Sequence, residues 1–311
     1  MKKDTLTIMN NRKAKSRVEK TAANLFVGCS IISILAVVCI TGYMIYAGMP
    51  AFFEVGFIEI LFGTVYQPSH TTDPQFGILY IILTSIIGVI ISVSIAVPIG
   101  VLTAINLAEL ASEKVSMVLK SAIELLAGIP SIVYGMLGYL VLTPLIYKLE
   151  LLVFKNVEGY QPTGGNNLLA AILVLTIMIL PTLINISETA LKTVPDDYRK
   201  SSLALGASKM QTIFKVVLPS AKYGIASALV LGVGRAIGEA MAIALVAGGV
   251  ANFPAPFSSV SFLTTAIVKD MKYATGLHQD VLFTIGLVLF VFILVINIGL
   301  TKILKRGDNH E

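Results

Sequence analysis

Charged residues are scarce in this chain of 311 residues, where Asp, Glu, Lys and Arg together make up only 13%. Hydrophobic residues make up 56%, and the mean hydropathy is +0.85. Several apolar runs are longer than the roughly 20 residues that a helix needs to cross a bilayer. The composition therefore argues against an ordinary soluble domain and indicates an integral membrane protein.

Cysteine and histidine are also rare. Cys29 and Cys39 lie in one apolar run, where a helix would separate them by about 15 Å, which is too far for a disulfide. The three histidines, His70, His278 and His310, are scattered over expected loops and the tail. No H-E-x-x-H, G-x-S-x-G or C-x-x-C motif occurs. We therefore expect neither a metal site nor an intramembrane hydrolase.

The sequence also lacks a G-x-x-x-x-G-K-[ST] loop, so it has no phosphate cradle of that kind for a nucleotide. We expect a transport subunit without its own ATPase site and without a bound cofactor. Any ATP-driven work must then come from another subunit. The net charge of +5 does not require a nucleic-acid partner, because the basic residues gather where they would set membrane topology.

Continuous apolar stretches predict an all-α membrane protein that crosses the lipid bilayer six times. The predicted helices are 23–47, 77–108, 120–147, 167–190, 223–248 and 280–303. A basic amino-terminal segment, 1–22, precedes the membrane domain, 23–306, and a short tail, 307–311, follows it. No polar segment is long enough for a second folded domain.

The distribution of Lys and Arg predicts the orientation in the membrane. Eighteen of the 23 lie on the side that holds both termini, four lie on the opposite side, and Arg235 is left inside the fifth predicted helix. Because basic residues concentrate in cytoplasmic loops, both termini are expected in the cytoplasm. We expect a multi-pass protein of a prokaryotic cytoplasmic membrane.

Three prolines, Pro98, Pro130 and Pro181, interrupt apolar runs and predict kinks, because each removes a backbone donor. Glu188 falls near the predicted cytoplasmic end of a helix. We expect it in a solvated or capping role there, since a carboxylate at a helix end can reach the membrane interface.

The largest basic loop, 191–222, is amphipathic. Its apolar residues recur at steps of four, three, four and three, which predicts one stripe on a helix. The stripe consists of Leu203, Ala207, Met210, Phe214 and Val217. Gly206 interrupts the helix and Pro219 is expected to end it. Such a helix can lie on the membrane surface or insert its apolar face into a groove of a cytoplasmic partner.

The stretch "GVGRAIGEAM", 232–241, places an arginine and a glutamate inside an apolar run. Arg235 and Glu239 stand at i and i+4, so a helix would bring them about 6 Å apart on one face. Pairing or access to water is expected, because an arginine inside the membrane costs at least about 2.5 kcal/mol. Gly234 and Gly238 form a small-xxx-small pair that lets another backbone approach. The charged residues either fix helix register or offer a guanidinium fork to an oxyanion.

The basic loop 191–222 resembles the signature loop of ABC importer permeases. That signature reads E-A-A, then three residues, Gly, nine residues, Ile, one residue and Leu-Pro. Gly206, Leu218 and Pro219 keep the register, and Val216 stands at the Ile position. The acidic position is occupied by Lys200. The resemblance implies a coupling helix that seats in a cleft of the ATPase subunit. The residues implied in this coupling are Leu203, Gly206, Ala207, Met210, Phe214, Leu218 and Pro219.

The stretches "AGIPSIVYG" and "GRAIGE" are most similar to the PstC-type permease family of phosphate-specific ABC importers, and the similarity extends from about residue 50 onward. It implies a six-helix type I ABC importer permease with the MetI-like fold, in which Arg235 and Glu239 take part in phosphate passage. The expected partners are a PstA-like second permease, a PstB-like ATPase dimer that uses ATP and Mg, and a PstS-like extracytoplasmic phosphate-binding protein.

Three alternatives remain at this point. The permease can serve another oxyanion, such as sulfate or molybdate, because fold does not specify substrate. A self-contained carrier or channel predicts flux from this chain alone. An assembly or sensor scaffold predicts that replacing Arg235 and Glu239 leaves uptake unchanged.

Overall fold

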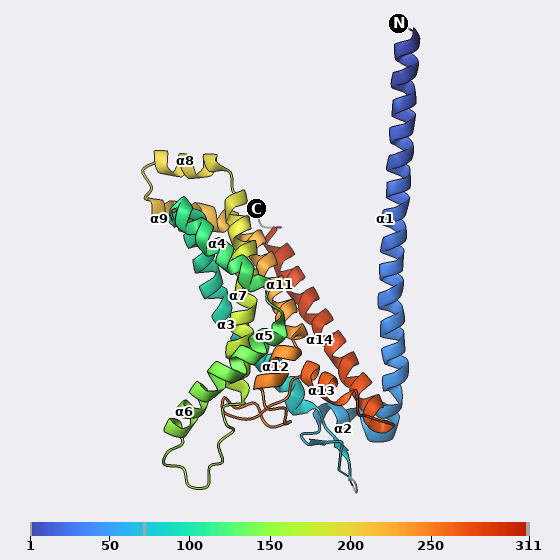
Figure 1. Cartoon of the computed structure of the whole chain (residues 1–311), viewed down its shortest axis with the longest axis vertical. Helices are drawn as coiled ribbons and strands as arrows, with labels where there is room; N and C mark the ends of the chain where they lie inside the picture. Colours follow the sequence, from blue (N-terminus) through green and yellow to red (C-terminus); the bar gives the residue numbers. More distant parts are fainter. Residues whose placement is uncertain (1, 71–72, 309–311) are drawn as a thin grey trace.

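The computed structural model describes residues 2–70 and 73–308, and almost all of the ordered elements are helices (Figure 1). The helices are α1 (Lys2–Ala51), α2 (Phe57–Phe62), α3 (Leu79–Ile105), α4 (Glu113–Ala127), α5 (Ser131–Leu137), α6 (Thr143–Val153), α7 (Leu168–Thr193), α8 (Asp196–Ala204), α9 (Lys209–Thr212), α10 (Leu218–Ser220), α11 (Lys222–Gly238), α12 (Met241–Val246), α13 (Leu263–Asp270) and α14 (Leu277–Asp308). Short π-helical turns occupy Phe52–Gly56, Asn106–Leu110, Gly138–Leu142 and Ile213–Val217. Strands β1 (Tyr66–Gln67) and β2 (Gln75–Phe76) form a small antiparallel pair, with Tyr66 opposite Phe76.

Among the described residues, five helical stretches are long and apolar enough to cross a membrane: Glu19–Phe62, Leu79–Leu110, Ser131–Val153, Leu168–Thr193 and Leu277–Gly299. A sixth arises if the helical segments Lys209–Ser220 and Lys222–Gly238, which meet at a bend of 66°, form one broken span. Four of the predicted helices, 23–47, 77–108, 167–190 and 280–303, fall on α1, α3, α7 and α14.

The predicted third helix, 120–147, is wrong as one continuous element. The chain leaves the helical conformation between α4 and α5, at Gly128 to Pro130, and the span-length stretch begins only at Ser131. Pro130 has no N–H to donate and disfavours helical geometry in the residue before it. Pro98 and Pro181, in contrast, lie inside the continuous helices α3 and α7.

Figure 1 shows how the helices are arranged. The last turns of α14 lie at the same end of the molecule as α8 and α9, and α1 also runs toward that end; we call this the α8 end. Helix α6 and the β1–β2 pair lie at the opposite end. Helix α1 stands apart from the bundle over most of its length and meets α14 only at its lower end. There, the Thr284 hydroxyl donates a hydrogen bond to the Gly48 carbonyl (2.8 Å).

The centre of the bundle is built from α3, α7 and α11. Leu183 of α7 packs between two glycines, because a Cβ atom at Gly100 or Gly232 would come within 3.1 or 3.0 Å of its side chain. The buried Ser92 hydroxyl of α3 donates to the carbonyl of Ile172 in α7 (3.1 Å). Small residues and polar contacts of this kind let membrane helices approach closely. The packing fixes α11, which carries Arg235, against α7.

A buried carboxylate organises the loop that follows α6. Glu150 is fully buried and accepts hydrogen bonds from the Tyr160 hydroxyl (2.6 Å) and from the backbone N–H and side chain of Thr163. Burial and the hydrogen bond to Glu150 raise the pKa of Tyr160 to about 12. Tyr160 therefore stays protonated and keeps donating at neutral pH.

Gly135 allows α5 and α12 to touch. A Cβ atom at this position would lie 2.6 Å from the Ala242 Cα, which is backbone and cannot turn aside. Gly135→Ala is therefore expected to destabilise the protein by about 1–3 kcal/mol through overpacking. Thermal unfolding of the purified protein measures this, with Gly234→Ala as the matched control, because no atom lies within 4 Å of a Cβ placed at Gly234. Equal unfolding temperatures for the two variants would contradict the packing described.

Candidate functional site

The helix that carries Arg235 breaks directly after it. α11 ends at Gly238, and Glu239 has extended backbone angles (φ −74°, ψ 125°) before α12 begins at Met241. The predicted fifth helix, 223–248, is therefore interrupted, and the expected i, i+4 geometry is wrong. Among the residues that the structure describes, Arg235 and Glu239 form no ion pair with each other.

Arg235 is hydrogen-bonded to a neutral partner. Its Nη1 donates to the hydroxyl oxygen of Thr182 in α7 (3.0 Å), and the side chain is half-buried. Arg235 lies thirteen residues after Lys222, so about 20 Å along α11 from the α8 end. It also occupies the last turn of α11, where a cation interacts favourably with the free carbonyls of the helix end. The guanidinium charge is thus fixed deep in the bundle without a carboxylate beside it.

Glu239 stabilises the break in the helix. Its Oε1 accepts the backbone N–H of Ala242 in the first turn of α12 (2.9 Å). Its own carbonyl accepts the hydroxyl of Thr264 in α13 (2.7 Å), and the residue is only 9% exposed. The carboxylate therefore acts as a cap for α12, and not as the counterion that the sequence spacing indicates.

Glu239→Gln is expected to preserve much of the fold at this position, because the amide oxygen can still accept from Ala242. Glu239→Ala removes the cap, and loss of such a cap costs about 0.5–2 kcal/mol. Thermal unfolding of the two variants checks this expectation. If the glutamine variant is as unstable as the alanine variant, the negative charge and not the cap is what the site needs.

Two broken helices meet at this site. Helix α5, which follows the break after α4, packs at Gly135 on Ala242 of α12, which follows the break after α11. The Tyr134 hydroxyl donates to the carbonyl of Leu126 across the first break (2.7 Å). Irregular backbone inside a membrane is tolerated where it is buried in protein or lines a water-filled cavity. The two helix breaks are therefore of the kind found at polar sites inside a membrane.

Gly234 and Gly238 meet no neighbour among the residues that the structure describes. A Cβ atom at either position would find no atom within 4 Å, and both residues have ordinary backbone angles. The close packing predicted for this pair is not formed inside the described part of the chain. Packing against another subunit stays a prediction.

The segment predicted to be one amphipathic helix folds as two helices. Gly206, with φ +85°, turns the chain between α8 and α9, a conformation that residues with a Cβ rarely adopt. Ser208 and Gln211 then form a reciprocal capping box that starts α9. The predicted interruption at Gly206 is confirmed, and it divides the predicted apolar stripe between separate helices.

Several predicted coupling residues nevertheless lie at the surface of this α8–α9 segment, 196–220. The exposed apolar side chains are Leu203, Leu205, Met210 and Phe214. Val217 is fully buried and does not belong to this surface. The segment therefore presents these apolar side chains, which we call its apolar patch, uncovered by the residues that the structure describes.

The remaining predicted coupling residues have mixed positions. Gly206 is exposed at the turn, whereas Ala207 and Leu218 are half-buried. Pro219 is exposed in α10, and the helix ends one residue later, at Ser220, close to the predicted end. The bend in the chain comes at Ala221.

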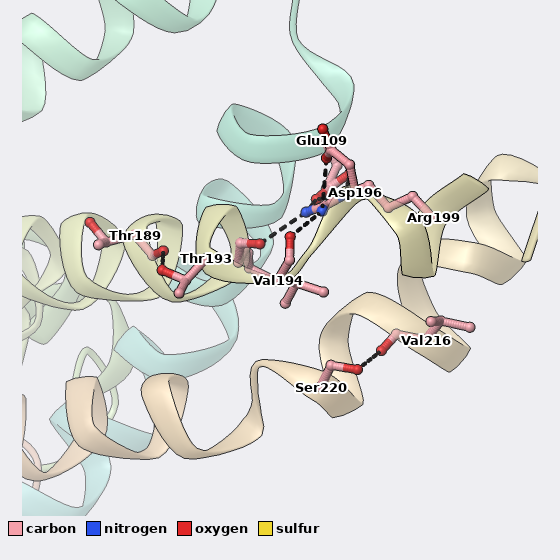
Figure 2. Close-up of polar contacts among 9 residues, drawn as sticks. Glu109, Thr189, Thr193, Val194, Asp196, Arg199, Val216 and Ser220 are labelled. Carbon is pink, nitrogen blue, oxygen red and sulfur yellow. Dashed lines mark hydrogen bonds and ion pairs between the residues drawn. The ribbon is translucent and has the colours of Figure 1, made fainter. Parts of the chain in front are cut away.

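Arg199 connects α8 to the bundle (Figure 2). Its Nη2 lies 2.6 Å from Glu109 Oε1, just after α3, and also donates to the carbonyl of Leu191 (2.9 Å). Its Nη1 donates to the carbonyl of Val194 (2.6 Å) and lies 3.3 Å from Asp196. The hydrogen bond to Glu109 raises the pKa of Arg199, so the guanidinium stays charged. One side chain thus joins α8 to the ends of α3 and α7.

Glu188 of α7 is fully buried, so the expected solvated or capping role is wrong. Its two carboxylate oxygens lie 2.9 Å from Lys120 Nζ and 2.6 Å from Lys192 Nζ. Lys120 belongs to α4, so this ion-pair group ties α4 to α7. The buried carboxylate is thereby neutralised, and the group keeps one net positive charge.

Sequence reasoning missed the roles of Arg199, Glu109 and Thr182. No sequence spacing reveals them, since their partners lie 53 to 90 residues away. No group of three or more His, Cys, Asp or Glu side chains among the described residues is placed to hold a metal ion.

Comparison with known proteins was made on sequence and on fold. Residues 96–307 match the family described as "Binding-protein-dependent transport system inner membrane component". The chain is 37% identical to a probable ABC transporter permease protein, YqgH, of Bacillus subtilis, over 93% of each chain. It is 34% identical to the phosphate transport system permease protein PstC of Pasteurella multocida, over 73% of this chain and 74% of that protein. A chain of a bacterial alginate ABC transporter shares its fold, with a TM-score of 0.64 at 16% identity over 92% of this chain and 96% of that chain.

Proposed function

We propose, from the premise that this chain belongs to the family of binding-protein-dependent transport system inner membrane components, that it is the permease subunit through which an ATP-driven importer passes inorganic phosphate. The observation that carries the proposal is the setting of Arg235. Its guanidinium lies half-buried at a helix break and hydrogen-bonds to the neutral hydroxyl of Thr182. Because no carboxylate among the described residues neutralises it, its charge is available to a passing anion.

The chemistry of a guanidinium supports phosphate as the anion. It offers a planar set of N–H donors and a permanent charge, which match the oxygens of a phosphate. Relatives named as phosphate transport system permease proteins are 30–34% identical to this chain over the aligned residues. We assign Arg235 to the anion path and Glu239 to the shape of that path, through its cap on α12.

The partners that we propose follow from the surfaces that the chain leaves uncovered. The apolar patch on the α8–α9 segment would seat on a PstB-like ATPase subunit, present as a dimer, which uses ATP and Mg. The open face at Gly234 and Gly238 would pack against a PstA-like permease, and a PstS-like binding protein would deliver phosphate from outside. The α8 end would face the cytoplasm, because most basic residues lie there.

Reconstitution with single components left out tests this function. Proteoliposomes are prepared with both permeases and the ATPase in the membrane, and the binding protein is added on the side from which phosphate is supplied. They are expected to take up radiolabelled phosphate only when ATP is present. Omission of any one component is expected to abolish uptake. Phosphate flux from this chain alone would support a self-contained carrier, and uptake of sulfate or molybdate in place of phosphate would assign another oxyanion.

A further inference from the structure

Four polar side chains follow one face of α7, from Arg235 toward the α8 end. They are Thr182, Asn185, Thr189 and Thr193, which we call the α7 polar stripe. The steps of three, four and four residues keep all four on the same side of a helix that turns once per 3.6 residues. Thr182, at the inner end, is the residue that receives the hydrogen bond from Arg235.

The exposure of the stripe within this chain increases toward the α8 end. Thr182 and Asn185 are half-buried, whereas Thr189 and Thr193 are exposed. Figure 2 shows Thr189 and Thr193 near the end of α7. The two exposed hydroxyls donate to carbonyls four residues earlier, each at 2.8 Å, and remain able to accept from water. The Oδ1 of Asn185 is buried and has no partner in the described structure. An amide oxygen left without a partner is costly, so this face requires water or a polar partner.

The stripe lies between two contacts of α7. Glu188 points toward α4, where it meets Lys120, and Ala190 points toward α11, where it meets Gly224. Successive helix residues are 100° apart, so Thr189 points midway between these two contacts. The stripe ends at a cleft of about 360 Å³, which is lined by residues that include Thr193, Tyr198 and Ser220. The polar face thus opens onto the surface of the molecule.

Positive charge stands at both ends of this polar face. Arg235 lies at its inner end, and Lys120 and Lys192 lie beside its outer half with Glu188 between them. The outer group keeps one net positive charge, because two lysines share one carboxylate. A hydrated anion that passes along the stripe would therefore be attracted at each end.

We infer that the α7 polar stripe is this chain's wall of the water-filled cytoplasmic half of the anion path. The inference rests on the proposed function and deepens it. The oxyanion leaves Arg235, moves along a wall whose hydroxyl and amide groups hold water, and reaches the Lys120 and Lys192 group at the cytoplasmic mouth. The ligand class is a hydrated oxyanion such as hydrogen phosphate.

Thiol accessibility in the assembled transporter tests the inference. Cys29 and Cys39 are first replaced by serine, and Asn185→Cys or Thr189→Cys is then introduced. The matched control is Leu102→Cys. Leu102 lies three residues from the end of α3, much as Thr189 lies four residues from the end of α7. The Leu102 side chain is 57% exposed on an apolar surface. Inside-out vesicles are treated with anionic and cationic methanethiosulfonate reagents of similar size.

The stripe cysteines are expected to react at least about tenfold faster than Leu102→Cys, since a thiol must meet water to form the reactive thiolate. The anionic reagent is expected to react faster with them than the cationic one, and modification of Asn185→Cys should block uptake. Rates as slow as that of Leu102→Cys would overturn the inference, because the face would then meet lipid or protein. A preference for the cationic reagent would also overturn it.

The result is separable from the proposed function. The labelling rates report whether the stripe meets water, whatever the transported substrate is. If the complex imports no phosphate while the stripe cysteines still react faster with the anionic reagent, the phosphate assignment is wrong and the inference about the water-filled path stands. If phosphate is imported while the stripe is inaccessible, the path fails and the function remains.

Discussion

Arg199→Ala is expected to uncouple ATP hydrolysis from transport, so that uptake falls about tenfold or more while the complex still hydrolyses ATP. Arg199 joins α8 to Glu109 and to the carbonyls of Leu191 and Val194. Its removal leaves the Glu109 side chain, which is only 9% exposed, without its partner. Breaking a buried pair in this way costs about 3–5 kcal/mol. The α8–α9 segment would then move without carrying α3 and α7 with it.

The measurement is the ratio of phosphate imported to ATP hydrolysed, in complexes whose subunits still elute together. Glu109→Gln should lower the same ratio, because it removes the charge from the other side of the contact. Asp196→Asn is the matched control, since Asp196 is 77% exposed and contacts the same guanidinium at 3.3 Å. An unchanged ratio in Arg199→Ala, or an equal loss in Asp196→Asn, would show that this contact does not transmit the motion.

The membrane-spanning helices could be predicted from the sequence because long apolar runs have few other stable structures in a bilayer. The predicted helix 167–190 corresponds to α7, Leu168–Thr193, within three residues at each end. The similarity seen in "GRAIGE" and "AGIPSIVYG" is confirmed by the match of residues 96–307 and by relatives of 34 and 37% identity. The importer permease fold is likewise confirmed by the shared fold of a known importer. The described residues give the predicted six crossings if Lys209–Ser220 and Lys222–Gly238 form one broken span.

The break after Gly238 could not be predicted from spacing alone. Arg235 and Glu239 are four residues apart, as in a continuous helix. The chain is held extended there by the Glu239 side chain, which accepts the Ala242 N–H, and by the contact of the Thr264 hydroxyl with the Glu239 carbonyl. That contact joins residues 25 apart in sequence. The two glycines before Glu239, at 234 and 238, were available as a signal of a weak helix, because glycine destabilises helix interiors.

The buried ion pairs between residues far apart in sequence could not be predicted from the sequence either. Glu188 is one residue among several near a predicted helix end, and its partner Lys120 is 68 residues away. Arg199 and Glu109 are separated by 90 residues. Charges at such positions look solvated until the fold shows which helices meet, so only three-dimensional packing distinguishes a buried carboxylate from an exposed one.

Arg235→Ala is expected to lower ATP-driven phosphate uptake by about ten- to a hundredfold. The estimate follows from the roughly 1.5–3 kcal/mol that a hydrogen bond to a charged group contributes, where each 1.4 kcal/mol changes a rate about tenfold. The fold should survive, because Arg235 is half-buried and its hydrogen-bond partner among the described residues, the Thr182 hydroxyl, can instead bond to water. Uptake of radiolabelled phosphate by the reconstituted complex measures the effect.

Arg235→Lys is the informative companion of this variant. It keeps the positive charge and loses the planar fork, so poor rescue indicates recognition of the oxyanion by two donors, and full rescue indicates attraction by charge alone. Thr182→Val tests the hydrogen bond that holds the Arg235 guanidinium, because the valine side chain has a similar shape and no hydroxyl. It is expected to reduce uptake less than Arg235→Ala does, since the guanidinium itself remains.

The most direct test of anion passage at Arg235 compares ATP-driven phosphate uptake of wild-type and Arg235→Ala complexes in proteoliposomes prepared side by side, with subunit content and ATP hydrolysis measured in the same samples. A collapse of uptake in fully assembled Arg235→Ala complexes is the predicted result. Uptake at the wild-type rate in the same assembled variant would contradict it, and the anion site would then lie elsewhere in this chain or on the second permease.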